Sequence, residues 1–435
     1  MTKLAVREQS SSVTPRQAYY ALFVLWMVNL LANIDRFSVG LVMQKIKTDL
    51  MMTDTQVGLI SGIAFVVAYT VFGFPIARWL DHGVRRNIMA WSLGIWSLMA
   101  VAFGSASSFV QLVLARAGLG AGEAACIPGA VSLIGDYFKR EKRTQAIGVF
   151  HSALAAAGIV GTPLIGILTD QYGWRVAVIF FGSIGLLLAF VVRFTMREPM
   201  RAAAARVEGA VLANKDTLWR ALKIMFSNRA FRWLLVGHAT YGIGIYAWVT
   251  WYPISLIRAY NMSYTQVGIF IGTWMGVAML IASLSSGWFC PSVARRTGND
   301  RWMVILPAAF CLLSIPAMIA TSLDVSQSVA MFAGGVVLFM TVARTPPMLS
   351  LALDLVPPSV HSLATLVIVI VTTSIGAAVG PIFVGIISDS VVAEVGPNAA
   401  LRWGLLWTAP TFGLLGALIA FLPARMIGRK VVPTA

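Results

Sequence analysis

The sequence predicts an all-α integral membrane fold of twelve transmembrane helices, arranged as two pseudo-symmetric six-helix bundles. Three observations lead to this prediction: an apolar composition, twelve separate apolar runs, and a set of motifs that occurs once in each half. Of the 435 residues, 58% are hydrophobic and 11% are charged, and the mean hydropathy is +0.80. A soluble protein carries about a quarter charged residues, so this balance indicates a chain whose surface faces lipid.

The apolar runs have the length of membrane spans, since a transmembrane helix needs about 20 apolar residues. They lie at about 18–41, 55–78, 87–107, 109–134, 145–168, 176–196, 229–256, 266–289, 303–322, 328–352, 362–388 and 401–424. We therefore expect an N-terminal six-helix bundle over 1–196, a cytoplasmic linker over 197–228 and a C-terminal six-helix bundle over 229–435. The linker is the longest polar stretch and the richest in Arg and Lys.

The basic residues predict the orientation. The chain has a net charge of +16, and most of its 33 Lys and Arg residues fall in the tails and the even-numbered loops. Because loops rich in Lys and Arg stay in the cytoplasm, we expect both termini there, with the chain in a bacterial inner (plasma) membrane. Nucleic acid is not an expected partner, because no soluble basic domain is left to bind it. The expected role of these charges is topology and contact with lipid headgroups.

The two halves repeat the same short motifs. Thr55-Gln56-Val57-Gly58 opens the second expected helix, and Thr265-Gln266-Val267-Gly268 opens the eighth. The basic pair Arg85-Arg86 returns as Arg295-Arg296. Further pairs are Pro128 with Pro346, Ser132 with Ser350, Asp136 with Asp354, Pro163 with Pro381, Gly166 with Gly385 and Asp170 with Asp389. A series of echoes in one order along the chain indicates a duplicated six-helix unit.

A duplicated six-helix unit is typical of transporters, which bind substrate near the middle of the bilayer between the two halves. A channel is less favoured, because no segment resembles a re-entrant selectivity filter. A membrane enzyme is also less favoured, because the four His and three Cys show no metal-ligand spacing and no phosphate-binding loop is present. We therefore expect no catalytic residue, no metal and no cofactor, a monomeric protein, and a proton gradient as the source of energy.

The loop after the second expected helix reads Ala77-Arg78-Trp79-Leu80-Asp81-His82-Gly83-Val84-Arg85-Arg86. It resembles the loop pattern of the major facilitator family, in which a glycine is followed by Asp-Arg, a second glycine and two basic residues, although three positions depart from the pattern. The resemblance implies a cytoplasmic gate, made by Asp81, Arg85 and Arg86, that closes one conformation. The alternative is that these charges only anchor the loop in the cytoplasm.

Further motifs resemble the Spinster-like branch of the major facilitator superfamily over nearly the whole chain. They are Asn33-Ile34-Asp35-Arg36, Arg116-Ala117-Gly118-Leu119-Gly120-Ala121-Gly122-Glu123-Ala124, Pro128, Asp136-Tyr137-Phe138, Gly173-Trp174-Arg175, Trp251-Tyr252-Pro253, Asn299-Asp300-Arg301-Trp302 and Gly380-Pro381-Ile382-Phe383-Val384-Gly385-Ile386-Ile387-Ser388-Asp389. Spinster-like proteins are associated with proton-linked export of sphingolipids and lysophospholipids, so the resemblance implies an amphipathic, lipid-like substrate. Anion–cation symporters of the same superfamily share the Asp-Arg pair and the glycine-rich stretch, and they imply a small organic acid instead.

Four ionisable residues lie inside expected helices of the first half: Asp35, Arg36, Arg116 and Glu123. A charge at the centre of a membrane helix costs about 2.5–3.5 kcal/mol on insertion scales, so such residues are expected to be functional. Arg116 and Glu123 are seven residues apart, which puts them on one face of a helix, about 10 Å apart along its axis. Asp35 and Arg116 lie at similar depth, which allows them to pair across the cavity.

These four residues are candidates for proton coupling and substrate binding. Dehydration favours the protonated form of a carboxyl group, whereas a nearby guanidinium favours the carboxylate. Because opening and closing a cavity changes both effects, the carboxyl group takes up or releases a proton. We predict Glu123, the deeper residue, as the proton site and Asp35 as the second, with Arg36 and Arg116 as substrate-binding residues. The alternative is a static network of ion pairs that holds two helices together.

In the second half, Arg344 is the charge that falls inside an expected helix. We predict that it binds an anionic headgroup or carboxylate of the substrate; the alternative is that its side chain extends to the cytoplasmic surface. Tyr241 and Tyr246, deep in the seventh expected helix, are predicted to line the cavity. Trp251 and Tyr252, nearer the outer end of that helix, are predicted to belong to the aromatic belt of the membrane surface.

These features together predict a secondary active transporter that moves an amphipathic or anionic organic substrate by proton-coupled alternating access. A lysolipid or sphingolipid is the favoured substrate class, and a small organic acid is the alternative. The expected partners are this substrate, protons and the lipid bilayer.

Overall fold

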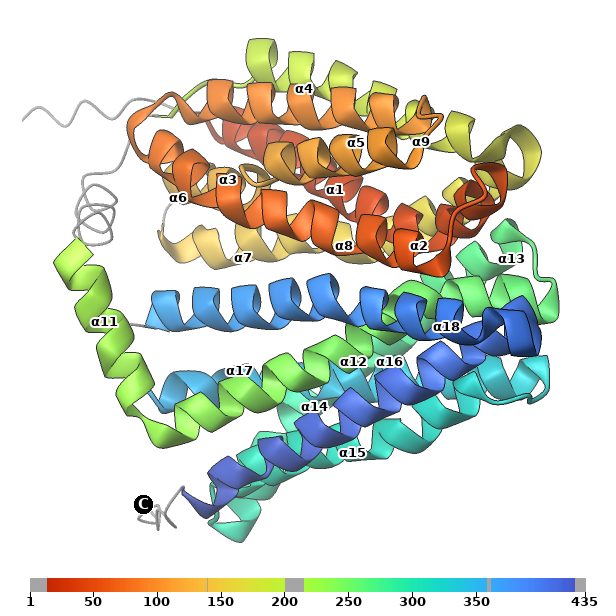
Figure 1. Ribbon diagram of the computed structural model, residues 1–435. Helices are drawn as coiled ribbons and strands as arrows, with labels where there is room; N and C mark the ends of the chain where they lie inside the picture. Colours follow the sequence, from red (N-terminus) through yellow and green to blue (C-terminus); the bar gives the residue numbers. More distant parts are fainter. Residues whose placement is uncertain (1–13, 139, 200–214, 358–360, 427–435) are drawn as a thin grey trace, which may run out of the picture.

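The computed structural model describes residues 14–138, 140–199, 215–357 and 361–426, whose regular structure is helical, with no strand among them. Figure 1 shows two stacked bundles of helices, one from each half of the chain. The described chain begins and ends on the left of this view, which we call the terminal end. The opposite end, where α2 and α13 begin, is called the distal end. The predicted all-α fold is therefore confirmed.

The first half forms one bundle. Its helices are α1 (Pro15–Asp49), α2 (Asp54–Ser61), α3 (Ile63–His82), α4 (Arg85–Gly104), α5 (Phe109–Glu123), α6 (Cys126–Tyr137), α7 (Arg140–His151), α8 (Ala153–Ala156), the π-helix η1 (Ala157–Gly161) and α9 (Thr162–Thr195). The fourth crossing is interrupted between α5 and α6. Pro128 contributes to this break, because a proline has no N–H to donate to the carbonyl group four residues earlier.

The second half forms the other bundle. Its elements are α12 (Arg229–Tyr260), α13 (Tyr264–Ile269), the π-helix η2 (Phe270–Met275), α14 (Gly276–Thr297), α15 (Trp302–Ser322), α16 (Gln327–Ala343), α17 (Thr345–Asp354), α18 (His361–Ala420) and the 3-10 helix η4 (Leu422–Arg425). Before it comes α11 (Lys215–Ser227), which Figure 1 shows beside the terminal ends of the bundle helices.

Nine helical segments of the described chain are long and apolar enough to cross a membrane. Two of them, Gln145–Thr195 and Ile370–Arg425, turn back at Gly173 (φ 84°) and Gly396 (φ 79°). This backbone conformation is essentially restricted to glycine, so each of these segments makes two crossings. Helix α12 is less apolar but runs alongside the others (Figure 1). The described residues therefore contain the twelve predicted crossings.

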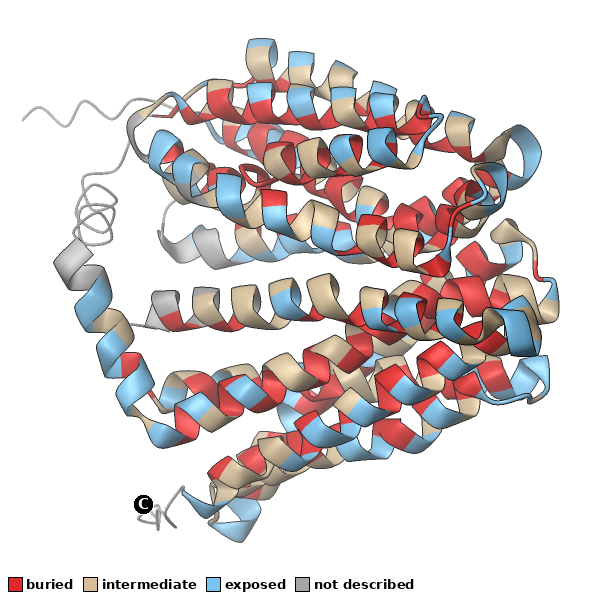
Figure 2. Ribbon diagram, in the orientation of Figure 1, coloured by how far each residue is buried: buried red, intermediate tan, exposed pale blue. Residues whose placement is uncertain are grey.

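The outer surface of both bundles is apolar. Figure 2 shows exposed residues along the outward sides of the helices. Many of these side chains are large and hydrophobic; Trp274, Leu284 and Phe332 are 72%, 76% and 76% exposed. Such a surface is unfavourable in water, whereas in a bilayer it faces lipid. The fold is therefore that of an integral membrane protein.

The motif repeated in the two halves begins a helix in each. Thr53 and Gln56 form a capping box at the start of α2, with side chain to N–H bonds of 3.2 Å and 3.0 Å. Ser263 and Gln266 form the same box at the start of α13, with bonds of 3.1 Å and 3.0 Å. Because a capping box satisfies N–H groups that lack a partner in the first turn, the local sequence sets both helix starts.

The halves touch at the distal end through glycines of this motif. A Cβ atom at Gly58 of α2 would lie 2.5 Å from the carbonyl oxygen of Pro381 in α18. A Cβ atom at Gly268 of α13 would lie 2.5 Å from the carbonyl oxygen of Thr162 in α9. Both distances are too short for a side chain, so the glycines let backbones of opposite halves pack directly. The two halves therefore meet through two equivalent pairs of helices.

We expect Gly58→Ala and Gly268→Ala to separate the halves at the distal end, because the added methyl group meets backbone. Overpacking of this kind costs about 1–3 kcal/mol, and each 1.4 kcal/mol is about a tenfold change in population. Distances between spin labels at Val110→Cys and Asn398→Cys, exposed distal positions on opposite halves, measure the separation. Gly335→Ala, where a Cβ meets nothing within 4 Å, is the control. Equal distances in all variants would contradict the expectation.

Candidate functional site

Two ion pairs join α1 to α5 inside the first bundle. Arg116 Nη1 donates to Asp35 Oδ2 at 2.8 Å. Next to Asp35 on α1, Arg36 forms an ion pair with Glu123. Four charges thus cancel in two pairs, as a region poor in water requires. The pairing of Asp35 with Arg116 was expected from their depth, whereas that of Arg36 with Glu123 was not.

The paired side chains differ in their access to solvent. The Glu123 side chain is 0% exposed and that of Arg116 is 4% exposed, whereas Asp35 is 14% and Arg36 is 38% exposed. The Arg116 guanidinium also lies over the ring of Phe65, 4.7 Å from its centre, which adds a cation–π contact. The partly exposed guanidinium of Arg36 therefore contacts a fully buried carboxylate.

The glycine-rich stretch of α5 explains how its charges come so near to other helices. A Cβ atom at Gly122 would lie 2.7 Å from the backbone nitrogen of Trp96 in α4. A Cβ atom at Gly120 would clash with the carbonyl oxygen of Phe65 in α3. Since only glycine permits such approach, these residues bring α5 against α3 and α4. Glu123 follows directly, at the end of α5.

Tyrosines from both halves lie near Arg36. Tyr69 of α3 and Tyr246 of α12 are close enough to act electrostatically on its charge. Tyr246 is half-buried, and its ring packs against Gly376 of α18. A Cβ atom added at Gly376 would lie 2.7 Å from this ring. The structure thus places Tyr246, but not Tyr241, beside the charges of the first half.

Tyr241 and Arg344 lie together inside the second bundle. The Tyr241 hydroxyl is 2.9 Å from Ser314 Oγ and 3.0 Å from Thr341 Oγ1, and the residue is 1% exposed. The Arg344 guanidinium lies 4.3 Å from the centre of the Tyr241 ring and contacts His238 Nδ1 at 2.5 Å. With 4% exposure, Arg344 does not extend to the surface, so that alternative is wrong. Tyr241 does not share a cavity with Arg36, because its hydroxyl finds partners within its own bundle.

The aromatic belt prediction for Trp251 and Tyr252 is also wrong. Trp251 Nε1 donates to the carbonyl oxygen of Pro381 at 2.9 Å, and the Tyr252 hydroxyl donates to the carbonyl oxygen of Ala330 at 3.0 Å. Both residues are at most 1% exposed. Their polar tips find partners in the bundle, so they do not need the membrane surface.

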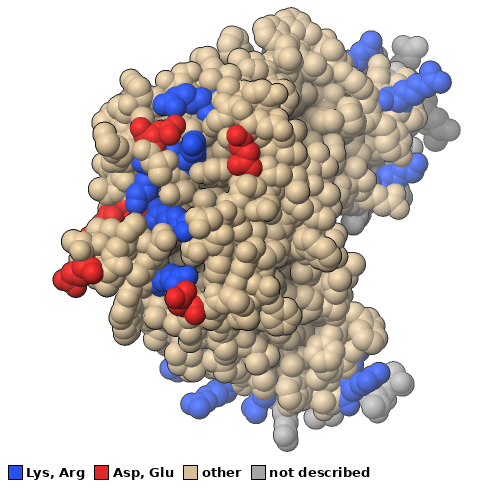
Figure 3. Space-filling model, turned by 90° about the vertical axis from the view of Figure 1, so that its right-hand side faces the viewer, with Lys and Arg blue, Asp and Glu red and all other residues tan. Residues whose placement is uncertain are grey.

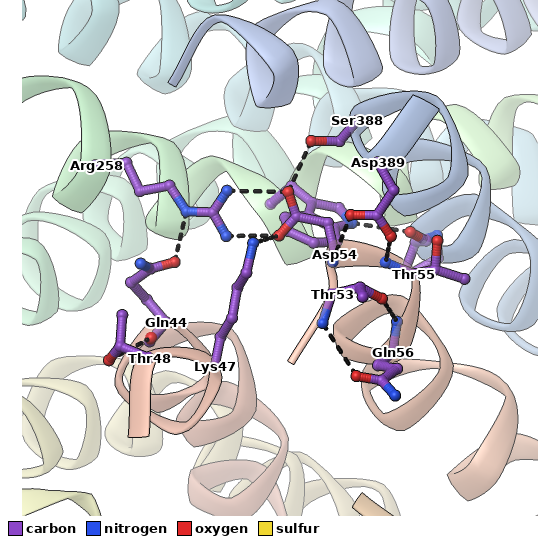
Figure 4. Close-up of polar contacts among 12 residues, drawn as sticks. Gln44, Lys47, Thr48, Thr53, Asp54, Thr55, Gln56, Arg258, Ser388 and Asp389 are labelled. Carbon is purple, nitrogen blue, oxygen red and sulfur yellow. Dashed lines mark hydrogen bonds and ion pairs between the residues drawn. The ribbon is translucent and has the colours of Figure 1, made fainter. Parts of the chain in front are cut away.

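A polar cluster at the distal end ties the halves together (Figure 4). Asp54, 1% exposed in the first turn of α2, accepts from Lys47 Nζ at 2.5 Å and from Ser388 Oγ at 2.7 Å. Arg258 of α12 donates to both oxygens of this carboxylate, at 3.1 Å and 2.7 Å, and to Gln44 Oε1 at 2.5 Å. Bidentate contacts of this kind are strong and directional. Asp54 therefore bridges α1, α12 and α18.

Two further carboxylates cap helices of the opposite half. Asp389 of α18 accepts from the first two N–H groups of α2, at 2.9 Å and 2.7 Å. Asp170 of α9 accepts from the first two N–H groups of α13, at 3.2 Å and 2.8 Å. A carboxylate at a helix N-terminus satisfies free N–H groups and interacts favourably with the helix dipole. The repeat therefore builds the same contact between the halves twice.

The sequence reasoning missed this distal closure. It found Asp170 and Asp389 only as an echo between the halves, and it did not single out Asp54 or Arg258. The available signal was the repeat itself, because the two Asp residues and the two capping motifs recur together. Figure 3, which views the right-hand side of Figure 1, shows acidic and basic side chains side by side over part of this face.

The predicted cytoplasmic gate residues lie at the terminal end of the first bundle. Arg85, 1% exposed, donates to Asp136 Oδ2 at 2.5 Å and to Glu198 Oε1 at 2.9 Å. The Arg86 backbone N–H donates to Glu198 Oε2 at 2.8 Å. Asp136 belongs to α6 and Glu198 to the segment after α9, so these contacts involve no residue of the second half, and the gate stays a prediction. The side chain of Asp81 is outside the described residues.

Comparison with known proteins agrees with the fold described above. Residues 25–381 match the Major Facilitator Superfamily. The chain is 27% identical over 423 residues to an MFS-type efflux pump of Mycolicibacterium smegmatis, which covers 97% of this chain and 96% of that protein. It is 28% identical over 318 residues to a probable L-galactonate transporter of Escherichia coli, covering 70% and 69%.

Among solved structures, the chain resembles a bacterial homologue of the human lysosomal transporter Spinster, in an inward-facing and unoccupied conformation. The TM-score is 0.84 with 25% identity, over 95% of this chain and 98% of that chain. The family and these relatives are transporters and not enzymes, as the sequence analysis expected.

We expect Asp389→Asn and Asp170→Asn each to open the distal end, because each removes the charge that holds two N–H groups of the other half. Hydrogen bonds to charged groups contribute about 1.5–3 kcal/mol, so the open population should rise about tenfold. The readout is the rate of maleimide labelling at Ser61→Cys, which should rise when the distal end opens. The native Ser61 hydroxyl is buried and without a partner. Asp324→Asn is the control, since that carboxylate is 88% exposed and pairs within the second half. Unaltered labelling rates would rule out a closing role.

Arg85→Ala should destabilise the first bundle rather than alter contact between the halves. Breaking a buried ion pair costs about 3–5 kcal/mol, and this variant removes the ion pairs of Arg85 with Asp136 and Glu198. The thermal-unfolding midpoint in detergent should therefore fall by several degrees. Arg295→Ala changes the exposed counterpart in the repeat and should leave the midpoint unchanged. Equal midpoints for the two variants would show that the Arg85 contacts add little.

Proposed function

The chain belongs to the major facilitator superfamily, and from this premise we propose that it moves an amphipathic or anionic organic substrate by proton-coupled alternating access. The observation that carries the proposal is the contact of Arg36, which is 38% exposed, with the fully buried carboxylate of Glu123. This contact joins a candidate proton site to a cation that a substrate can reach.

Arg36 neutralises either Glu123 or an anionic group of the substrate, but not both at full strength. While Glu123 is charged, loss of Arg36 leaves a buried carboxylate unpaired, which is strongly unfavourable. Protonation of Glu123 removes that penalty and frees Arg36 for the substrate. Asp35, whose partner is Arg116, is the second proton site in this scheme. Proton and substrate binding are then coupled through one guanidinium.

Alternating access requires that the two halves close on one side of the substrate at a time. The described hydrogen bonds between the halves lie at the distal end and involve the side chains of Gln44, Asp54, Asp170 and Asp389. We infer that this conformation is open at the terminal end, which we assign to the cytoplasm. The likeness to an inward-facing relative supports this assignment. The distal bonds then break when the transporter turns outward.

A lysolipid or sphingolipid is the favoured substrate class, because the sequence motifs resemble the Spinster-like branch and the chain resembles a solved bacterial Spinster homologue. A small organic acid is the second candidate, supported by the identity to a probable L-galactonate transporter. Both classes bring an anionic or strongly polar group to the arginines of α1 and α5. Thermal-shift measurements with lysolipids, sphingoid bases and galactonate distinguish them, because only the true class raises the unfolding midpoint at low concentration.

Glu123→Gln should abolish accumulation driven by a proton gradient while exchange without a gradient survives, because the amide keeps the shape but does not titrate. Proteoliposomes loaded with the ligand identified by thermal shift provide the assay, with and without an imposed pH difference. We expect at least a tenfold loss of gradient-driven transport, and a smaller loss for Asp35→Asn.

Asp324→Asn is the matched control, because it also removes a carboxylate that pairs with an arginine, but one exposed at the distal end. It should transport as the wild type does. Gradient-driven accumulation at the wild-type level in Glu123→Gln would sink the assignment of the proton site and leave Glu123 as a structural partner of Arg36.

A further inference from the structure

The second bundle contains a buried guanidinium whose contacts carry no negative charge. Arg344 lies between α16 and α17 and is 4% exposed. Its Nη1 lies 2.5 Å from His238 Nδ1 and 3.8 Å from the sulfur of Met348, and it sits over the Tyr241 ring. The thiol of Cys311 also faces it, and its Nε has no hydrogen-bond partner. Because arginine stays protonated, His238 accepts through an unprotonated Nδ1.

The other buried arginines are neutralised. Of the three arginines buried in the described ranges, Arg85 meets Asp136 at 2.5 Å and Arg116 meets Asp35 at 2.8 Å. The described contacts of Arg344 include no carboxylate. An unpaired charge in an apolar bundle is strongly unfavourable. Its presence therefore points to a counter-charge that the described part of the chain does not supply.

Arg344 faces a recess in the second bundle. The recess lies between α12, α15, α17 and the end of α18. Apart from Arg344, His238 and Tyr241, its lining is largely apolar and includes Leu234, Val304, Pro307, Ala308 and Leu351. A site with one cation and apolar walls suits a ligand with one anionic group and an apolar body.

The recess also lies beside a helix break that has a counterpart in the first half. Pro128 and Pro346 correspond in the two halves, and each stands beside a break, in the fourth and the tenth crossing. Glu123 precedes the first break, and Arg344 occupies the second. Interrupted helices at corresponding places of two repeats are the positions where such transporters bind ligands.

We propose that this recess is a second binding site, which takes an amphipathic anion. Its carboxylate or phosphate lies against the guanidinium of Arg344, whose planar donors match such groups, and its apolar part lies along the walls. The site is in the second bundle and involves neither Asp35 nor Glu123. This second site is therefore independent of proton-coupled transport, and a measurement of amphiphile binding is enough to test it.

The test is thermal unfolding of the purified full chain in a neutral detergent with five probes. Octanoate and octyl phosphate carry the proposed chemistry, octyl glucoside is apolar without charge, and acetate and inorganic phosphate are bare anions. We expect octanoate or octyl phosphate to raise the unfolding midpoint, and the stronger of the two identifies the preferred head group. Stabilisation by the bare anions to the same extent, or by neither amphiphile, overturns the proposal.

Variants locate the site. Arg344→Met should weaken binding of the effective amphiphile at least tenfold, whereas Arg402→Met, which removes an arginine paired with exposed Asp324, should bind as the wild type does. Without ligand, Arg344→Met should unfold no lower than the wild type, because an apolar chain replaces an uncompensated charge. A much lower midpoint, or binding unchanged from wild type, overturns the proposal.

A second variant keeps the charge and fills the space. Ala420→Phe adds a ring at a half-buried position of the lining. It should also weaken binding of the effective amphiphile at least tenfold, while the first-bundle charges are untouched. Undiminished binding in this variant places the amphiphile elsewhere and overturns the proposal.

Discussion

Charge inside an apolar bundle must be neutralised by an opposite charge nearby, because the lipid around it offers no water to do so. In the first bundle this constraint pairs Asp35 with Arg116, and Arg36 with Glu123, and it thereby sets the rotation of α1 against α5. At the distal end it gathers two cations and a hydroxyl around Asp54. The relative placement of these helices follows from which carboxylate each cation needs.

The polar contacts fall into two sets with different consequences. Those of Arg85, Arg116 and Glu123 lie within the first bundle, so they hold it together as one body. Those of Asp170 and Asp389 join one bundle to the other, at the distal end and through backbone N–H groups. An assembly of two internally bonded bodies with polar contacts at one end suits rigid-body rocking. Beside these bonds, Gly58 and Gly268 let the backbones of the two halves pack closely without interlocking side chains.

The two halves repeat the same helix starts and turns, but they differ in their buried polar residues. Both halves share helix starts, capping carboxylates and reversals at glycine, yet among the described residues the buried ion pairs within one bundle lie in the first. Where the first half has Arg116 and Glu123, the corresponding residues of the second are Gly334 and Thr341. Thr341 lies 3.0 Å from the hydroxyl of Tyr241, so hydrogen bonds between neutral groups replace ion pairs there. The polar groups inside the two bundles therefore differ in their chemistry.

The sequence by itself determined the helices, the crossings, the duplication and which charges lie inside the first, fourth and tenth crossings. These depend on residues close along the chain: apolar runs of membrane length, a capping residue three positions before its partner, a glycine where the backbone must reverse. Only the tertiary structure decided that Arg36 meets Glu123, that Arg85 bonds within its own half, and that Tyr241 is enclosed in the second bundle. Such pairings depend on the rotation and depth of helices far apart in sequence, and a periodic pattern does not record these quantities.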